Sequence, residues 1–115
     1  TNIKLVWYYN NLLGRPERKK IISRRSSYHG VLIGSGSLSG LPHLHASFDL
    51  PLNDRFVHVQ TPHYYRHAPA GMSEAEFVQL LAEDLEQTIE REDPRTVAAF
   101  IAEPVMGAGG VLVPP

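Results

Sequence analysis

The sequence contains no cysteine, and this absence excludes several kinds of site. Without thiols there is no disulfide framework, no cysteine-ligated metal and no cysteine nucleophile, and the composition suits a reducing compartment, with the cytoplasm as default. The sequence also lacks an excess of positive charge, because its formal net charge is −1. We therefore expect no nucleic-acid partner, since nucleic-acid-binding proteins carry a basic patch or stripe.

Long apolar runs are missing as well. No run approaches the ~20 apolar residues of a membrane-spanning helix, and no signal-peptide pattern opens the chain, so we expect no membrane association. What remains is 43% hydrophobic and 20% charged residues in 115 positions, which is typical of one soluble domain. The sequence starts at Thr1 and stops at Pro115, just after a glycine-rich loop, and we expect it to be part of a longer protein.

Two segments have the apolar spacing of helices. Apolar residues recur at helical intervals between positions 3 and 13, and Gly14 marks the end of this first helix. Ser73 and Glu76 form a capping box that begins a second amphipathic helix, which should end near Asp93.

Three other segments are predicted as strands. They span residues 21–23, 56–59 and 96–102, and the last is a continuous apolar run, typical of a strand buried on both faces. Residues 34–54 are rich in glycine, serine and proline, which indicates a long irregular connection with one short helical turn. The alternation of strands and helices favours an α/β fold with a parallel sheet.

Polar residues follow two of these strands. Tyr28, His29 and Gly30 come after the first strand, and Glu103 comes directly after the last one. The carboxyl ends of parallel strands share one edge of the sheet, so both groups should lie at that edge, where ligands bind. A carboxylate such as Glu103 is costly to bury without a partner, and a structural salt bridge is the alternative to a functional role.

Two other motifs indicate a functional site less strongly. Gly34, Gly36 and Gly40 resemble a dinucleotide-binding loop, but Pro42 follows too soon for a helix and no suitably spaced acidic residue is present. A flexible loop is the favoured interpretation. Six histidines raise the question of zinc, but they lack metalloprotease spacing, so we favour solvated or hydrogen-bonded loop histidines.

Two longer segments resemble one enzyme family. "TNIKLVWYYNNLLGRPERKKIISRRSSYHG" and "AAFIAEPVMGAGGVLVPP" resemble class III aminotransferases, particularly the ω-amino acid or amine:pyruvate branch. The ordered pair of Tyr-His-Gly and Glu-Pro-x-x-Gly-x-Gly-Gly is more specific than either motif alone, and the resemblance covers the whole sequence. It implies a fold-type I enzyme that depends on pyridoxal 5'-phosphate (PLP). Residues 1–115 would form part of its PLP-binding large domain, a mostly parallel sheet between helices, incomplete at both ends.

The resemblance assigns roles to four residues. Tyr28 would lie against one face of the pyridine ring, with its hydroxyl near the substrate. His29 would shape the loop, and Gly30 would permit its turn. Glu103 would support the cofactor site electrostatically, beside the acid that binds the pyridine nitrogen.

Other parts of the family's site have no match in the sequence. These are the glycine-serine turn that holds the phosphate, the acid at the ring nitrogen and the Schiff-base lysine. The three lysines present, Lys4, Lys19 and Lys20, stand outside any matching context. We therefore expect no catalytic residue within residues 1–115, and we expect these residues alone to be inactive.

The resemblance also implies an activity for the complete protein. It would transfer an amino group from a small amine or ω-amino acid donor to a keto acid. Ala108 occupies the position where relatives that use α-ketoglutarate carry a glutamate that pairs with a mobile arginine, so pyruvate is the expected acceptor. We expect a homodimer, with residues 34–54 at its interface. The alternative is a non-catalytic α/β interaction domain that retains the fold.

Overall fold

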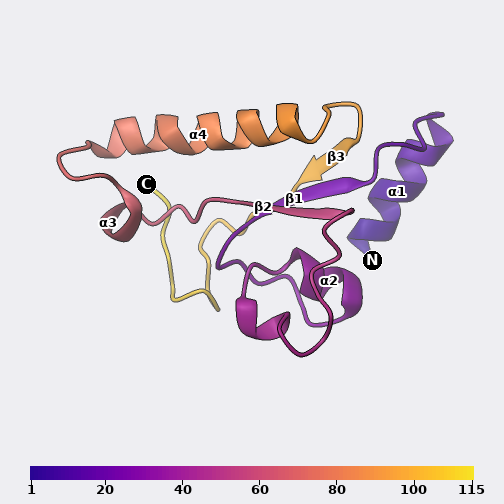
Figure 1. Ribbon diagram of the computed structural model, residues 1–115, viewed down its shortest axis with the longest axis horizontal. Coiled ribbons are helices and arrows are strands. Elements are labelled where there is room, and N and C mark those ends of the chain that lie inside the picture. The colour runs from indigo at the N-terminus through magenta and orange to yellow at the C-terminus, as the bar shows by residue number, and fades with distance from the viewer.

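A computed structural model describes all residues from 1 to 115, and Figure 1 shows how its elements are arranged. Its regular elements, in chain order, are α1 (Asn2–Leu12), β1 (Lys20–Arg24), α2 (Ile33–Leu38), the 3-10 turn η1 (Pro42–Leu44), β2 (Phe56–Val59), α3 (Tyr64–His67), α4 (Glu74–Arg91) and β3 (Val97–Phe100). The strands pair in the order β2-β1-β3, and both pairings are parallel. The predicted parallel sheet is confirmed.

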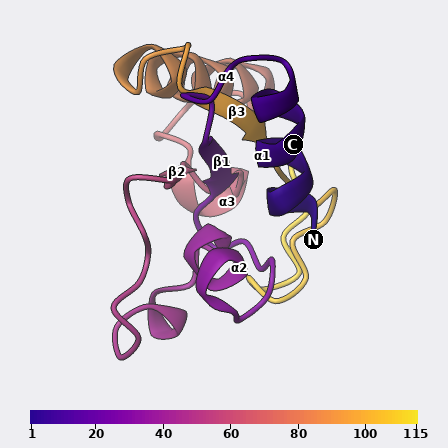
Figure 2. The ribbon, with the colours of Figure 1, turned by 90° about the vertical axis from the view of Figure 1, so that its right-hand side faces the viewer.

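The sheet lies between two layers of helices. Figure 2 shows α4 on one side of the sheet and α1 and α2 on the other. Ile21 of β1 and Phe56 of β2 are paired across the sheet and pack with Leu38 of α2 in the main core. The α1 side chains that pack against this core are Ile3, Val6 and Trp7. Because side chains alternate along a strand, the fully buried Ile22 faces the α4 side.

Both predicted helices are confirmed, together with the signals that bound them. Gly14 has a φ of 69° just after α1, a conformation that favours glycine at a helix end. The Trp7 indole N–H donates to the carbonyl of Lys19 at 2.8 Å and so ties α1 to the start of β1. At the start of α4, the Ser73 hydroxyl accepts from the Glu76 N–H at 3.3 Å, and the Glu76 carboxylate accepts from the Ser73 N–H at 2.8 Å.

The connection over residues 34–54 is more regular than expected, because it contains both α2 and η1. Glycine and serine are poor helix formers, but here serine hydroxyls bond to carbonyls one turn earlier. Ser37 donates to the carbonyl of Ile33 at 2.6 Å, and Ser39 donates to that of Ser35 at 3.0 Å. The short helix α3 was also not predicted.

The third strand is confirmed, but its expected burial on both faces is wrong. β3 has half-buried side chains, and Phe100 at its end is 42% exposed. The reason is its position, because β3 pairs with β1 alone and its other edge has no neighbouring strand. No helix in this structure combines the length and the apolar character that crossing a membrane requires.

Candidate functional site

The loops that follow β1 and β3 meet at the carboxyl edge of the sheet, and Glu103 joins them. One carboxylate oxygen, Oε1, accepts from the backbone N–H of Tyr28 at 2.8 Å. The other, Oε2, accepts from the N–H of Gly107 at 3.2 Å. The sequence prediction that Tyr28 and Glu103 lie together is therefore confirmed.

Glu103 is held by backbone amides and not by an ion pair. The salt bridges of the chain involve other acids, namely Asp54, Glu92 and Asp93. Arg24 approaches Glu103 but donates to its backbone carbonyl, at 3.3 Å, and its guanidinium lies 5.7 Å from the centre of the Phe100 ring. The structural salt bridge considered for this carboxylate is absent, and its charge stays available at the edge of the sheet.

The Tyr28 side chain is presented on the surface of this edge. Its backbone is fixed by Glu103, but the residue is 42% exposed and its ring has no aromatic neighbour in the chain. A fixed backbone beneath an exposed ring suits stacking against a flat ligand.

The turn after Tyr28 requires glycine. Gly30 has a φ of 121°, which side chains rarely adopt, and a Cβ there would lie 2.7 Å from the Ser35 hydroxyl oxygen. Ser39, which is buried, fixes the same turn because its hydroxyl accepts from the His29 N–H at 2.8 Å and lies 3.0 Å from the Gly30 carbonyl. Sequence reasoning missed Ser39, since nothing separates it from the other serines of this segment.

His29 has a buried ring nitrogen without a partner. Its Nε2 forms no hydrogen bond in the chain. Burial lowers the pKa of His29, and the nearby charge of Glu103 opposes this shift. The imidazole is therefore held in its neutral form near pH 7.

A contact between the glycine-rich loop and the loop after β1 was also missed from the sequence. Gly109 lies against the chain just before Tyr28, so closely that a Cβ would collide with the carbonyl oxygen of Ser26. Ser26 itself has a φ of 68°. The glycine-rich run after Glu103 thus packs against the loop after β1, which explains why both motifs are needed to build one edge.

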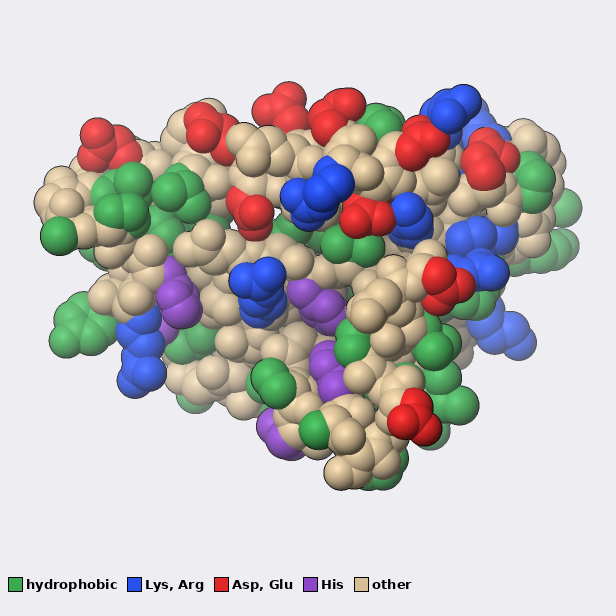
Figure 3. Space-filling model, in the orientation of Figure 1, with side chains coloured by type: hydrophobic (Ala, Val, Ile, Leu, Met, Phe, Trp, Pro, Cys, Tyr) green, Lys and Arg blue, Asp and Glu red, His purple; other side chains and the backbone are tan.

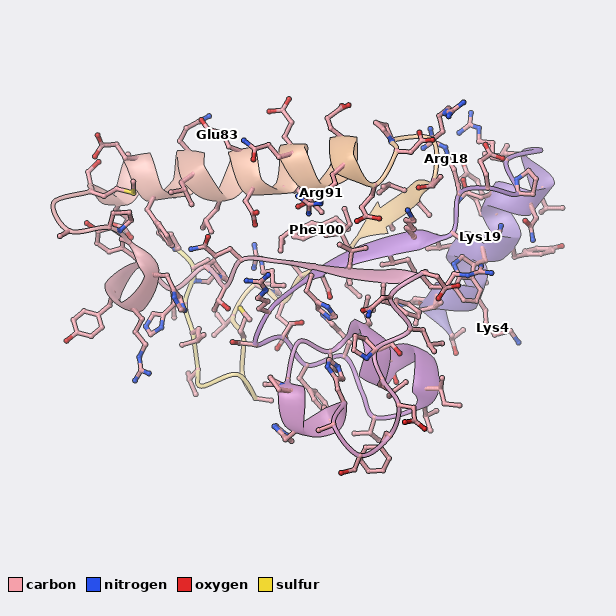
Figure 4. All side chains as sticks on the ribbon, viewed as in Figure 1. Lys4, Arg18, Lys19, Glu83, Arg91 and Phe100 are labelled. Atoms are coloured by element: carbon pink, nitrogen blue, oxygen red, sulfur yellow. The ribbon has the colours of Figure 1, made fainter.

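The three lysines lie away from this edge. Figure 4 shows Lys4 and Lys19 at the α1 end of the molecule. Lys19 and Lys20 stand where β1 begins, at the opposite edge of the sheet. Lys19 donates to the Asn11 side chain, and Lys20 pairs with Glu92 at 2.8 Å. The lysines are therefore not brought to Tyr28 and Glu103.

The two other sequence motifs are ordinary structure. His45 and His58 bond through Nε2 to the carbonyls of Gly36 and Leu38, at 2.9 and 3.1 Å. His45 is therefore a hydrogen-bonded loop histidine, as expected, whereas His58 lies in β2. No three His, Asp or Glu side chains gather closely enough to hold a metal ion. Residues 31–33 form no strand before the glycines, so the strand and loop of a dinucleotide site are not present there.

The edge fits one wall of a site for a planar heteroaromatic ligand such as PLP. The exposed Tyr28 ring offers a stacking surface, and Glu103 supplies negative charge beside it. No amine nucleophile accompanies them. The arrangement can therefore position a ring, while the remaining chemistry needs groups from elsewhere.

The chain matches a known family over its whole length. The family model described as "Aminotransferase class-III" matches residues 1–115. The chain is 58% identical over 116 residues to "Probable gamma-aminobutyrate transaminase 4" of Oryza sativa subsp. japonica, with 100% of this chain and 24% of that protein covered. It is 57% identical over 115 residues to "Gamma aminobutyrate transaminase 3, chloroplastic" of Solanum lycopersicum, with 100% and 22% covered. It thus spans about a quarter of the length of these relatives.

Solved structures share the same architecture. The ω-transaminase of Pseudomonas jessenii in complex with PMP matches with a TM-score of 0.96 and 57% identity, covering 98% of this chain and 25% of that one. A structure described as "Transaminase with L-ala" matches with a TM-score of 0.95 and 62% identity, covering 98% and 26%. At this identity the small parallel sheet and its helices correspond to part of the transaminase fold.

Proposed function

Because this chain belongs to the class III aminotransferases, we propose that the complete protein is a PLP-dependent transaminase that moves an amino group from an amine or ω-amino acid to a keto acid. One observation carries the proposal. The Glu103 carboxylate joins the Tyr-His-Gly loop and the glycine-rich loop through two backbone N–H groups. The two motifs that distinguish the family are thus parts of one site.

The residues of this edge would each contribute to holding the cofactor. PLP, when bound, supplies the electron sink that weakens bonds next to the substrate nitrogen. Tyr28 would lie against one face of the pyridine ring. Glu103 links the two loops and would place negative charge near the ring, and Gly30 allows the turn after Tyr28. His29 would keep the loop in shape as a neutral imidazole.

The groups that complete the reaction are proposed to lie outside residues 1–115. They are the phosphate-binding turn, the acid at the ring nitrogen and the lysine that carries the cofactor and moves the proton. This division agrees with the share of the relatives that the chain covers, about a quarter.

The donor is proposed from the relatives. Several are named gamma-aminobutyrate transaminases, and others are ω-transaminases, so the substrates of this protein are proposed to be a terminal amine and a keto acid. The cytoplasmic compartment stays a prediction, because some relatives are named mitochondrial or chloroplastic.

The test is an assay of the complete, PLP-loaded protein. Gamma-aminobutyrate and a simple primary amine would each be supplied with pyruvate, and alanine formation would be measured. Alanine formation that depends on both substrates and on PLP is the expected result. A folded protein that neither binds PLP nor forms alanine with any amine donor would instead favour the non-catalytic interaction domain.

A further inference from the structure

Two hollows open side by side at the carboxyl edge of the sheet. Their volumes are about 530 and 410 Å³, and they share Ser26, Thr61 and His67. We call the combined space the basic hollow. It is bounded by the loops that follow all three strands, including residues 109–113 after β3.

The lining of the basic hollow contains arginine and histidine side chains and no acid. Its ionisable side chains are Arg25, His45, His58, His63, Arg66 and His67. Figure 3 shows histidine and basic side chains gathered below α4, while most acidic side chains on this face lie along α4 itself. The cationic partners in the salt bridges of the chain are Lys20, Arg55 and Arg95, so Arg25 and Arg66 are not neutralised by any carboxylate.

Two hydroxyl groups, those of Ser26 and Thr61, also line the hollow. The Thr61 hydroxyl donates to the carbonyl of Arg25 at 3.0 Å and lies 3.3 Å from the Ser26 hydroxyl. Since the Thr61 proton is already used, the Ser26 hydroxyl is the donor in its contact with Thr61. The close approach of Gly109 to the Ser26 backbone holds the two loops together, and Thr61 is almost fully buried.

We propose that the basic hollow is a binding site for a small oxyanion, with a carboxylate or phosphate group as the recognised chemistry. Two guanidinium groups without carboxylate partners and the imidazoles of His63 and His67 line one concave space, and each can donate to anionic oxygen. A metal cation does not fit, because no three His, Asp or Glu side chains gather closely enough to hold one. The site is separate from the Tyr28 ring, and it needs no residue that the proposed reaction uses.

The experiment uses the complete protein loaded with PLP, so that the cofactor's own phosphate site is filled. Inorganic phosphate and acetate are titrated separately by calorimetry in a buffer free of other oxyanions. Comparison of the phosphate titration with the acetate titration shows whether the site prefers a phosphate or a carboxylate group. We expect saturable binding in at least one arm.

Variants locate the binding. Arg66→Gln should raise the dissociation constant by about fivefold or more, because a charge-assisted contact is lost. Arg66→Lys keeps the charge without the planar guanidinium, so its dissociation constant should lie between those of the unaltered protein and Arg66→Gln. Arg95→Gln is the matched control, since it removes the same charge from a residue paired with Asp93 outside the hollow, and it should change binding less than about twofold.

Three results would overturn the proposal. They are no saturable binding by the unaltered protein, equal weakening by Arg66→Gln and Arg95→Gln, and unchanged binding in Arg66→Gln. If Arg66→Gln does not fold, Arg25→Gln is subjected to the same criteria. Binding is measured without amine donor or keto acid, so its outcome does not depend on whether the protein transfers amino groups.

Discussion

Glu103 shows how a single side chain can organise the site. A backbone hydrogen bond to a charged acceptor contributes about 1.5–3 kcal/mol, and this carboxylate accepts two of them, from Tyr28 and Gly107. The same two bonds leave the Tyr28 ring exposed while its backbone is fixed. The residue thus stabilises the edge and prepares it for a ligand at the same time.

The first prediction concerns Tyr28 in the complete protein. Tyr28→Ala should lower kcat/KM and weaken PLP retention, because stacking of aromatic rings is worth about 0.5–1.5 kcal/mol beyond the area buried. Tyr28→Phe keeps the ring and should be milder, so it serves as the matched control. Both are measured by steady-state kinetics and by the cofactor absorption band. Unchanged activity together with an unchanged band in the alanine variant would rule out the stacking role.

The second prediction concerns the keto acid. Ala108 is exposed in the glycine-rich loop beside Gly107, and its methyl group cannot pair with an arginine. With one amine donor, kcat/KM for pyruvate should exceed that for α-ketoglutarate by about tenfold or more, equivalent to ~1.4 kcal/mol. Ala108→Glu should narrow this difference, and Ala108→Ser should not. A strong preference of the unaltered enzyme for α-ketoglutarate would contradict the prediction.

At the scale of elements, the sequence predicted what local chemistry decides. The capping box at Ser73 and the end of α1 at Gly14 depend on neighbouring residues alone, and both are correct. Only one short helical turn was predicted in residues 34–54, whereas both α2 and η1 form there, because the glycines and serines of α2 are stabilised by tertiary packing of Leu38 and by hydroxyl contacts. In the same way, Ser39 acts through a turn that folds back from Gly30, a contact with no trace in local spacing.

The third prediction tests the start of α4. Ser73→Ala removes the cap and should cost about 1 kcal/mol, seen as faster amide hydrogen exchange in the first turn of α4 in the complete protein. Hydrogen bonds from the Ser73 side chain and backbone lower the pKa of Glu76 below its ordinary value of 4.5. A carboxyl group whose pKa is lowered by folding stabilises the folded state at pH values above its ordinary pKa. This stabilisation is lost as the pH falls through the folded-state pKa.

The pH dependence of amide protection provides a control for the Ser73→Ala prediction. The difference in protection factors between the unaltered protein and Ser73→Ala should be full near pH 7 and should shrink below about pH 4.5. Glu76→Gln keeps the reach of the side chain without a charge, so its protection should vary less over that interval. A difference for Ser73→Ala that grows as the solution is acidified would contradict this account.

At the scale of the whole molecule, the parallel sheet could be predicted from the alternation of strands and helices, and so could the edge where its motifs meet. The degree of burial could not. Only 16 of 115 residues are buried, and β3 has an open outer edge, because burial depends on neighbours that a local pattern does not reveal.

The fourth prediction concerns assembly of the complete protein. Residues 31–33 are consecutive apolar side chains that are 64–77% exposed, and Phe48 in the following connection is 67% exposed. Such a patch suits an interface, so we propose a homodimer or a larger oligomer that uses residues 31–54. Sedimentation velocity should show no monomer at micromolar concentration. Leu32→Glu should weaken the assembly more than Leu12→Glu, on exposed α1; an active monomer would refute the proposal.

The last prediction concerns residues 1–115 by themselves. Their open β3 edge and the apolar hollow between α4 and Phe100 leave strand and side chains without covering neighbours, so the isolated piece should associate or fold poorly. Tyr28 stacking, at about 0.5–1.5 kcal/mol, cannot offset an association cost of about 4–15 kcal/mol. Borohydride reduction with PLP, followed by peptide mapping, should therefore find no stoichiometric label on any lysine and no turnover of an amine donor. Stoichiometric labelling of Lys4, Lys19 or Lys20 together with turnover would place the catalytic lysine within these residues and overturn the division of the site proposed above.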